Sequence, residues 1–312
     1  MHWKTKAQIQ NVVAILPASL SYAAYYWLQR NFGGLKKMDP IGPLKAGVET
    51  WRLITKFEVA PEGKVFLEVG TGRAPLTPLA YWLMGAKSII TIDQNRYMRD
   101  ELITESLSYI AENTDEVQKL FEPFLNNDRL NALLDFAAKP VFSIDAFLQL
   151  TNITYIAPGD AAQTGLQPGT VDYHTSYNVL EHIPPQILRD ILEEGNRVIA
   201  PDGLFVHRID YSDHFAHSDS SISAINFIKY TDAEWNKLAG NRYMYMNRLR
   251  HDDFLGIFGD AGHSILSSEA VVDERSLALL RSGDFQVDQR FRQKSENTLS
   301  IVDSWMVTHN AQ

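Results

Sequence analysis

The 312-residue sequence predicts an α/β protein in which helices cover both faces of one mostly parallel, seven-stranded sheet, an arrangement called doubly wound. From Lys64 onward, short apolar runs typical of buried strands alternate with segments of helical periodicity. The first of these runs ends in a glycine-rich turn, which is common where a parallel strand passes into a helix. Hydrophobic residues make up 45% of the chain, so we expect a sizeable core.

The predicted strands are short apolar or β-branched runs, and most are bounded by glycine, proline or a polar turn. They are 64–70 (KVFLEVG), 88–93 (SIITID), 153–156, 171–176, 203–210 (GLFVHRID), 263–272 and 299–309. The predicted helices of the alternating part are 75–84, 97–111, 184–199, which begins at a Pro-Pro pair, and 251–261. Two stretches do not fit the alternation and are expected to be insertions, namely 113–152, which is mostly helical, and 211–250.

Residues 1–60 are predicted to form an N-terminal helical segment, and 61–312 the sheet domain with its two insertions. No charged residue occurs between positions 7 and 29, but polar residues dilute this stretch and Pro17 interrupts it, so it is not expected to span a membrane. We expect two short helices that break at Pro17 and end at Gly33. Together with the two insertions, they are expected to cap the functional site.

Charge is unevenly distributed along the chain. The formal net charge is −9, yet residues 1–60 hold eight Lys or Arg against three Asp or Glu. The acidic balance argues against a nucleic-acid partner, which usually requires a basic surface. The basic and aromatic stretch 7–37 could make a peripheral membrane contact. With no cysteine, disulfide scaffolds, thiolate metal sites and cysteine nucleophiles are excluded, and a cytoplasmic location fits.

The strongest functional signal is a glycine loop directly after the first strand. Glu68 precedes it, and Gly70 and Gly72 allow a tight turn and a close approach to a ligand. Asp93 ends the next strand, where a carboxylate suits a pair of ribose hydroxyls. The third glycine of a dinucleotide-binding loop is replaced by Pro75, which argues against a dinucleotide.

With this loop and acid, the sequence resembles the class I S-adenosylmethionine-dependent methyltransferases, a family with a Rossmann-like fold. The matching stretches are EVGTGRA (68–74), TIDQN (91–95), 157–185 and RVIAPDGLFV (197–206). The resemblance implies S-adenosyl-L-methionine as cofactor and S-adenosyl-L-homocysteine as product. It places Asp93 on the ribose, Asp160 on the adenine amino group and Ala161 beside the adenine ring. The full implied cofactor set is Glu68, Gly70, Thr71, Gly72, Asp93, Gln94, Asp160, Ala161 and Asn178.

Residues for acceptor chemistry are expected in the loops that follow the fourth and fifth strands. The candidate catalytic residues are His182, Asp210 and His214, with His214 accepting a proton and Asp210 stabilising the imidazolium. A divalent metal held by Asp210, Asp213 and His214 is the rival interpretation, but a metal is not predicted because the spacing matches no familiar metal site.

The candidate acceptor-binding residues are His207, Arg242, Arg248 and Arg250, since arginine binds carboxylate or phosphate. These arginines would suit an anionic acceptor. Because the loops offer His and Asp as bases for a hydroxyl, the predicted reaction is O-methylation of a small molecule or a sugar or glycan. Two alternatives remain open at this point. One is a nucleic-acid or protein methyltransferase, and the other is a scaffold that binds the cofactor without turnover.

Overall fold

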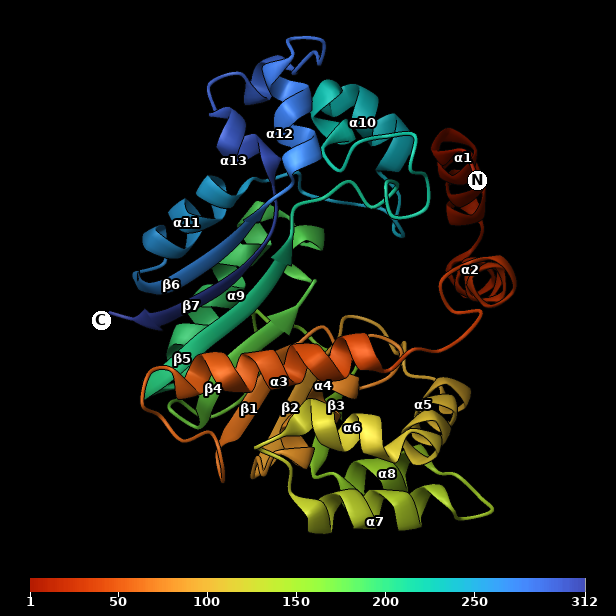
Figure 1. Ribbon diagram of the computed structural model, residues 1–312, viewed down its shortest axis with the longest axis vertical. Coiled ribbons are helices and arrows are strands. Elements are labelled where there is room, and N and C mark those ends of the chain that lie inside the picture. Colours follow the sequence, from red (N-terminus) through yellow and green to blue (C-terminus); the bar gives the residue numbers. More distant parts are fainter. Residues whose placement is uncertain (312) are drawn as a thin grey trace.

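The computed structural model describes residues 1–311, and its centre is one seven-stranded sheet with the order β3-β2-β1-β4-β5-β7-β6 (Figure 1). Strands β1 to β5 run parallel, whereas β7 is antiparallel to both β5 and β6. The strands are β1 (Val65–Val69), β2 (Ser88–Ile92), β3 (Ile153–Ile156), β4 (Val171–Tyr177), β5 (Ile199–Asp210), β6 (His263–Val272) and β7 (Ile301–Asn310). This arrangement confirms the predicted α/β fold class.

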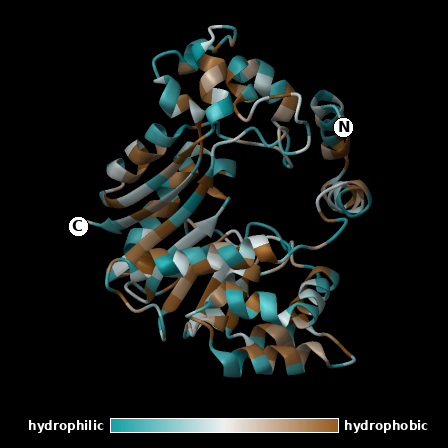
Figure 2. Ribbon diagram, viewed as in Figure 1, coloured by the Kyte–Doolittle hydropathy of each residue, from teal (hydrophilic) through white to brown (hydrophobic). Residues whose placement is uncertain are grey.

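Helices cover both faces of the sheet, because successive strand residues point to opposite faces and both sets are apolar. In β1, Phe66 packs into the core beneath α3 (Ile41–Thr55) and α4 (Leu76–Leu83), whereas Leu67 packs into the core beneath α9 (Pro185–Val198) and α11 (His251–Asp260). Figure 2 shows hydrophobic residues concentrated along the central strands. The helices are α1 (Trp3–Ile15), α2 (Ala18–Phe32), α3 (Ile41–Thr55), α4 (Leu76–Leu83), α5 (Asp100–Glu112), α6 (Thr114–Phe121), α7 (Asn127–Ala137), α8 (Ile144–Leu150), α9 (Pro185–Val198), α10 (Asp232–Ala239), α11 (His251–Asp260), α12 (Glu274–Arg281) and α13 (Glu296–Ser300).

The N-terminal segment divides into two parts with different partners. As predicted, α1 and α2 break at Pro17. Helix α3 was not predicted as an element of its own, and its residues Leu44, Val48 and Trp51 lie in the main core with α4. This part of the 1–60 segment therefore belongs to the sheet domain rather than to a cap.

A small separate core joins α1 to the 211–250 insertion and to α12. Trp3 is 3% exposed, and its ring lies 5.4 Å from that of Phe215 and 6.5 Å from that of Trp235. Leu280 of α12 packs into the same cluster. Figure 1 shows α10, α12 and α13 together beyond one end of the sheet, with α1 beside α10.

The 113–152 insertion lies away from the position expected for it. Its helices α6, α7 and α8 pack near the start of β2, where Arg129 donates hydrogen bonds to the carbonyls of Trp82 (2.6 Å) and Ala86 (2.8 Å). This is the amino end of the parallel strands, opposite the edge where ligands bind in such sheets. The expectation that this insertion caps the site is therefore wrong.

Within residues 1–311, no helix is both long and apolar enough to cross a membrane.

Candidate functional site

The loops that follow β1, β2, β4 and β5 meet at the carboxyl edge of the sheet. Gly70 adopts φ +87° and Gly72 φ +68°, a region that residues with a side chain rarely occupy. A Cβ at Gly70 would lie 2.4 Å from Cγ2 of Val179 in the loop after β4. Glycine at this position therefore lets the loops after β1 and β4 pack directly against each other.

Asp93 joins the glycine loop to the loop after β2. Its Oδ2 accepts a hydrogen bond from the Gly72 amide at 2.9 Å, and its Oδ1 accepts one from the Asn95 amide at 3.1 Å. Burial raises the pKa of Asp93, and the backbone amides that bind its carboxylate oppose this effect. The structure thus places the two strongest sequence signals, the glycine loop and the acid after β2, side by side.

Two members of the implied cofactor set are buried beneath the loop. Glu68 is 2% exposed and accepts hydrogen bonds from the hydroxyls of Tyr81 (3.2 Å) and Thr175. Burial raises the pKa of Glu68 to about 7. The hydroxyl of Thr71 lies 2.5 Å from that of Thr91. Through these contacts, the side chains of Glu68 and Thr71 stabilise the glycine loop from its buried side.

The other members of the implied cofactor set lie in the loops that follow β2, β3 and β4. The loop that carries Asp160 is held to Asp93 by a hydrogen bond from the Gly159 amide to the Asp93 carbonyl (2.9 Å), and Asp160 itself is exposed. Ala161 packs into the core cluster beneath α9 and α11, and Gln94 is exposed. Asn178 follows β4 with φ +55°, and its Oδ1 accepts a hydrogen bond from Arg208 at 2.8 Å.

Helix α2 lies across this part of the site. The Tyr22 hydroxyl donates to Oδ1 of Asn95 (3.4 Å), and the Arg73 guanidinium lies 5.0 Å from the Tyr26 ring. On its other side, α2 contacts the 211–250 insertion, where the rings of Tyr25 and Tyr243 stack at 3.9 Å. The helix therefore bridges the cofactor loops and the insertion.

The three candidate catalytic residues come together as expected. Nε2 of His214 lies 3.3 Å from Oδ2 of Asp210, and the rings of His182 and His214 are 4.9 Å apart. Although burial alone would raise the pKa of Asp210, the contact with His214 and the hydrogen bonds from Ser212 lower it to about 2. Asp210 is therefore ionised and can hold a cation or an imidazolium.

Glu181, which was not among the predicted site residues, lies against the same group. Glu181 is 2% exposed, and among residues 1–311 neither of its carboxylate oxygens completes a hydrogen bond, although the backbone amides of Glu181 and Asp210 lie near enough to lower its pKa. Burial raises its pKa well above the ordinary value. One carboxylate oxygen of Glu181 and one ring nitrogen each of His182 and His214 all lie within 4.8 Å of one another. In the sequence, the only indication that Glu181 contributes to the site is its position next to His182.

A hollow of about 410 Å³ opens beside Asp210, a volume suited to a small molecule. Its charged lining includes Arg208, Arg275 and Asp303, together with Asp210 itself. The sequence analysis missed Arg208 and Arg275. Arg208 follows His207 in β5, so strand alternation sends their side chains to opposite faces.

The four predicted acceptor residues are not in this hollow. Arg250 is fully buried and donates hydrogen bonds to the carbonyls of Tyr211 (2.6 Å), Leu299 (2.9 Å) and Ile301.

Arg248 is 2% exposed and donates hydrogen bonds to the carbonyls of Phe227 and Tyr230 and to the carboxylate of Asp232. Both guanidinium groups are thus occupied within the protein, and their prediction as acceptor ligands is wrong.

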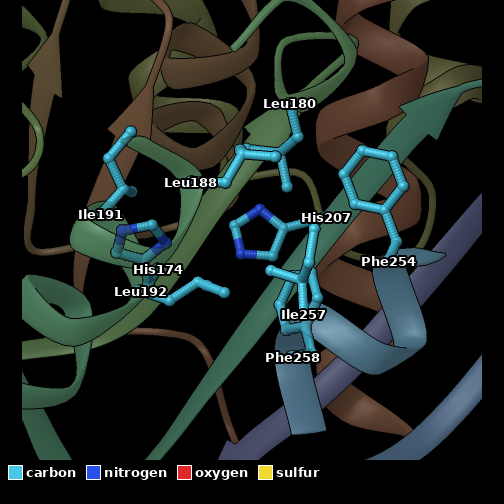
Figure 3. A pocket seen from close by; sticks show the side chains of 9 residues that line it. All are labelled: His174, Leu180, Leu188, Ile191, Leu192, His207, Phe254, Ile257 and Phe258. Atoms are coloured by element: carbon cyan, nitrogen blue, oxygen red, sulfur yellow. The ribbon is translucent and has the colours of Figure 1, made fainter. Parts of the chain in front are cut away.

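His207 and Arg242 also have other roles. Nδ1 of His207 lies 2.7 Å from the Ser176 hydroxyl, and the ring is fully buried. It lines an apolar cavity of only about 10 Å³ between β5, α9 and α11, together with His174 (Figure 3). Burial lowers the pKa of both histidines, so they are neutral core residues. Arg242 contacts α1 and α2, through the Ala14 carbonyl (3.4 Å) and the Tyr22 ring.

The metal set considered from the sequence is also separated. Asp213 is fully buried, and its carboxylate accepts hydrogen bonds from the Asn226 side chain (3.0 Å) and the Phe215 amide (2.9 Å). Its two oxygens are therefore engaged away from His214.

Comparisons with known proteins find similarity to solved structures only. No family model matches the sequence, and no curated protein matches it. Among solved structures, it is similar to geranyl diphosphate C-methyltransferase from Streptomyces coelicolor A3(2), in complex with Mg²⁺, geranyl diphosphate and S-adenosyl-L-homocysteine. The identity is 10%, the match covers 84% of this chain and 78% of that chain, and the TM-score is 0.45. It is also similar to a protein from Pyrococcus horikoshii OT3, with 13% identity, coverage of 85% and 90%, and a TM-score of 0.44.

At these identities and scores the fold assignment rests on the topology itself. The mostly parallel sheet, the glycine loop after β1 and the acid after β2 are the features of a Rossmann-like fold.

Proposed function

We propose that the protein transfers the methyl group of S-adenosyl-L-methionine to an oxygen of a small-molecule or glycan acceptor. The observation that carries this proposal is the hydrogen bond from the Gly72 amide to Asp93 at the carboxyl edge of the sheet. It brings a loop that can approach a ligand closely next to a carboxylate that suits ribose hydroxyls. The hydrogen bond from the Gly159 amide to the Asp93 carbonyl supports a position of Asp160 and Ala161 next to the adenine.

The acceptor would occupy the hollow beside Asp210. Its volume fits a sugar-sized molecule. Its charged lining is mixed, with Arg208 and Arg275 beside Asp210, Asp273 and Asp303, and Arg208 already binds Asn178 and Asp303, so the lining favours a polar acceptor such as a sugar. In-line attack of the acceptor oxygen on the sulfonium methyl requires the two reactants to be aligned, and such positioning can lower a barrier by about 7–11 kcal/mol. Helices α1 and α2, which bridge the cofactor loops and the 211–250 insertion, would exclude water from the reaction.

An oxygen acceptor is favoured over a nitrogen acceptor because Asp210 lines the hollow and His214, next to His182, lies against it. Two ways of activating a hydroxyl are open to this group. His214, oriented by Asp210, can accept the proton, an effect that typically contributes about 10²–10⁴-fold to a rate. Alternatively, a bound metal ion can lower the pKa of the hydroxyl.

Calorimetric titration of the full chain with S-adenosyl-L-homocysteine tests the cofactor assignment. We expect wild-type protein to bind one equivalent and Asp93→Ala to bind much more weakly, because the ribose loses its carboxylate partner. Asp202→Ala is the matched control, since Asp202 is exposed at the amino end of the sheet. Equal binding by the Asp93→Ala variant would refute the ribose assignment, and binding without any methyl transfer would favour the non-catalytic alternative.

A further inference from the structure

We propose that Glu181, His182 and His214 form a binding site for one divalent first-row transition-metal ion. The site itself follows from these residues alone, whereas its role in catalysis rests on the proposed methyl transfer. One ligand atom from each residue lies within 4.8 Å of the other two, and the side chains would have to draw closer around an ion to reach the about 2.0–2.2 Å typical of bonds to such ions.

Glu181 is the observation that distinguishes this group from an ordinary polar cluster. Its carboxylate is almost completely buried, and although the backbone amides of Glu181 and Asp210 lie near it, neither completes a hydrogen bond to its oxygens among residues 1–311. An unpaired buried carboxylate is costly, so buried carboxyl groups are normally hydrogen-bonded, paired with a charge or bound to a metal. A cation between Glu181 and the two histidines would supply the missing partner.

The histidines are arranged as metal ligands usually are. Nδ1 of His182 lies 2.8 Å from the carbonyl of Tyr245, which can only accept a hydrogen bond. The proton therefore resides on Nδ1, and Nε2 keeps its lone pair for a ligand. A hydrogen bond from the other ring nitrogen to a backbone carbonyl is a common way of orienting a ligating histidine. Asp210, with Oδ2 at 3.3 Å from Nε2 of His214, adds negative charge at the edge of the site.

The ligand types indicate the class of metal. Two imidazole nitrogens and one carboxylate suit Zn²⁺, Co²⁺, Fe²⁺ or Mn²⁺, whereas Mg²⁺ and Ca²⁺ prefer oxygen ligands throughout. Three protein ligands leave at least one coordination position open, as in catalytic rather than structural sites.

The location gives the ion a role in the proposed reaction. Val179, two residues before Glu181, packs against Gly70 of the glycine loop, and Asp210 lines the hollow proposed for the acceptor. An acceptor hydroxyl at the open position would have a lowered pKa and release its proton to water. The oxygen would then attack the methyl carbon, so the O–C bond forms while the C–S bond breaks and sulfur keeps the electron pair.

Cobalt titration tests the site directly. The full-length chain is treated with a chelator, freed of it, and titrated with Co²⁺ while visible absorption and bound metal are measured. We expect one Co²⁺ per chain in wild-type protein. In Glu181→Gln, His182→Gln and His214→Gln, affinity should fall by more than the about 10–100-fold that loss of an outer-shell partner costs. His2→Gln is the control for nonspecific binding to an exposed histidine.

Binding of S-adenosyl-L-homocysteine by the same variants shows whether they remain folded and separates the two proposals. Failure to bind Co²⁺, or unchanged Co²⁺ affinity in the Glu181→Gln and His214→Gln variants, would overturn the metal site while leaving cofactor binding intact. Stoichiometric Co²⁺ binding without binding of S-adenosyl-L-homocysteine would instead overturn the methyltransferase assignment and retain the metal site.

Discussion

Gly70 combines two requirements that only glycine meets, a positive φ of +87° and a contact with Val179 that leaves no room for a Cβ. We predict that Gly70→Ala weakens binding of S-adenosyl-L-homocysteine and lowers the free energy of unfolding by more than the about 1–2 kcal/mol that a left-handed conformation costs. Gly283→Ala is the control, because it has φ +75° without a neighbour within 4 Å. Denaturant unfolding and calorimetry measure both effects. Equal losses in the two variants would show that the contact with Val179 is unimportant.

Glu68 should make stability depend on pH. Burial raises its pKa from the ordinary value of 4.5 to about 7 in the folded protein, so folding favours the protonated form. Its contribution to the free energy of unfolding is therefore highest at and below pH 4.5 and declines as the pH rises to 7. We predict that the wild type loses about 3 kcal/mol over this window relative to Glu68→Gln.

Urea unfolding of the cofactor-free protein between pH 4.5 and 8 checks this difference. Glu58→Gln, at an exposed position, is the control and should follow the wild type. A constant difference between wild type and Glu68→Gln across the range would contradict the raised pKa.

At the scale of single elements, α1 and α2 expose large apolar side chains although they also bridge the site. Val12, Ile15, Leu20 and Trp27 are 66%, 83%, 60% and 57% exposed. Together with the basic residues of the N-terminal segment, these side chains support a peripheral membrane contact through residues 7–37. The contact remains a proposal about the outer surface of these helices.

We predict that the protein floats with vesicles rich in anionic phospholipid, and that Ile15→Glu combined with Trp27→Glu abolishes flotation. A charge on the outer surface should oppose insertion, without disturbing Trp3 and the buried side of α1. Val141→Glu is the matched control, because Val141 is 78% exposed elsewhere on the molecule. If the wild type fails to float, the exposed side chains do not form a membrane contact.

At the scale of the whole molecule, Arg250 connects the sheet to the lobe around α10 and α12. Its guanidinium binds carbonyls at the end of β5, in α13 and at the start of β7, and burial lowers its pKa to about 10. We predict that Arg250→Ala destabilises the protein by more than about 3 kcal/mol, because three buried carbonyls lose their donor.

Arg242→Ala should change stability far less, since Arg242 is exposed and only contacts α1 and α2 from the 211–250 insertion. Thermal and denaturant unfolding compare the two variants. A stable Arg250→Ala protein with weakened acceptor turnover would instead restore the original assignment of Arg250 as an acceptor ligand.

The sequence by itself determined the strands, the α1–α2 break at Pro17 and the glycine loop with Asp93. These features depend on neighbours along the chain, through apolar periodicity, fixed proline geometry and the freedom of glycine to adopt positive φ. They could therefore be predicted without knowledge of the tertiary structure.

Only the tertiary structure decided which polar side chains face the site. Arg248, Arg250 and His207 looked available in the sequence, yet their strands and loops carry them into the core. Glu181 looked like an ordinary loop residue, yet the packing of the loops after β4 and β5 encloses it with two histidines. The direction of a side chain depends on what packs against its element, and that contact joins residues far apart in the sequence.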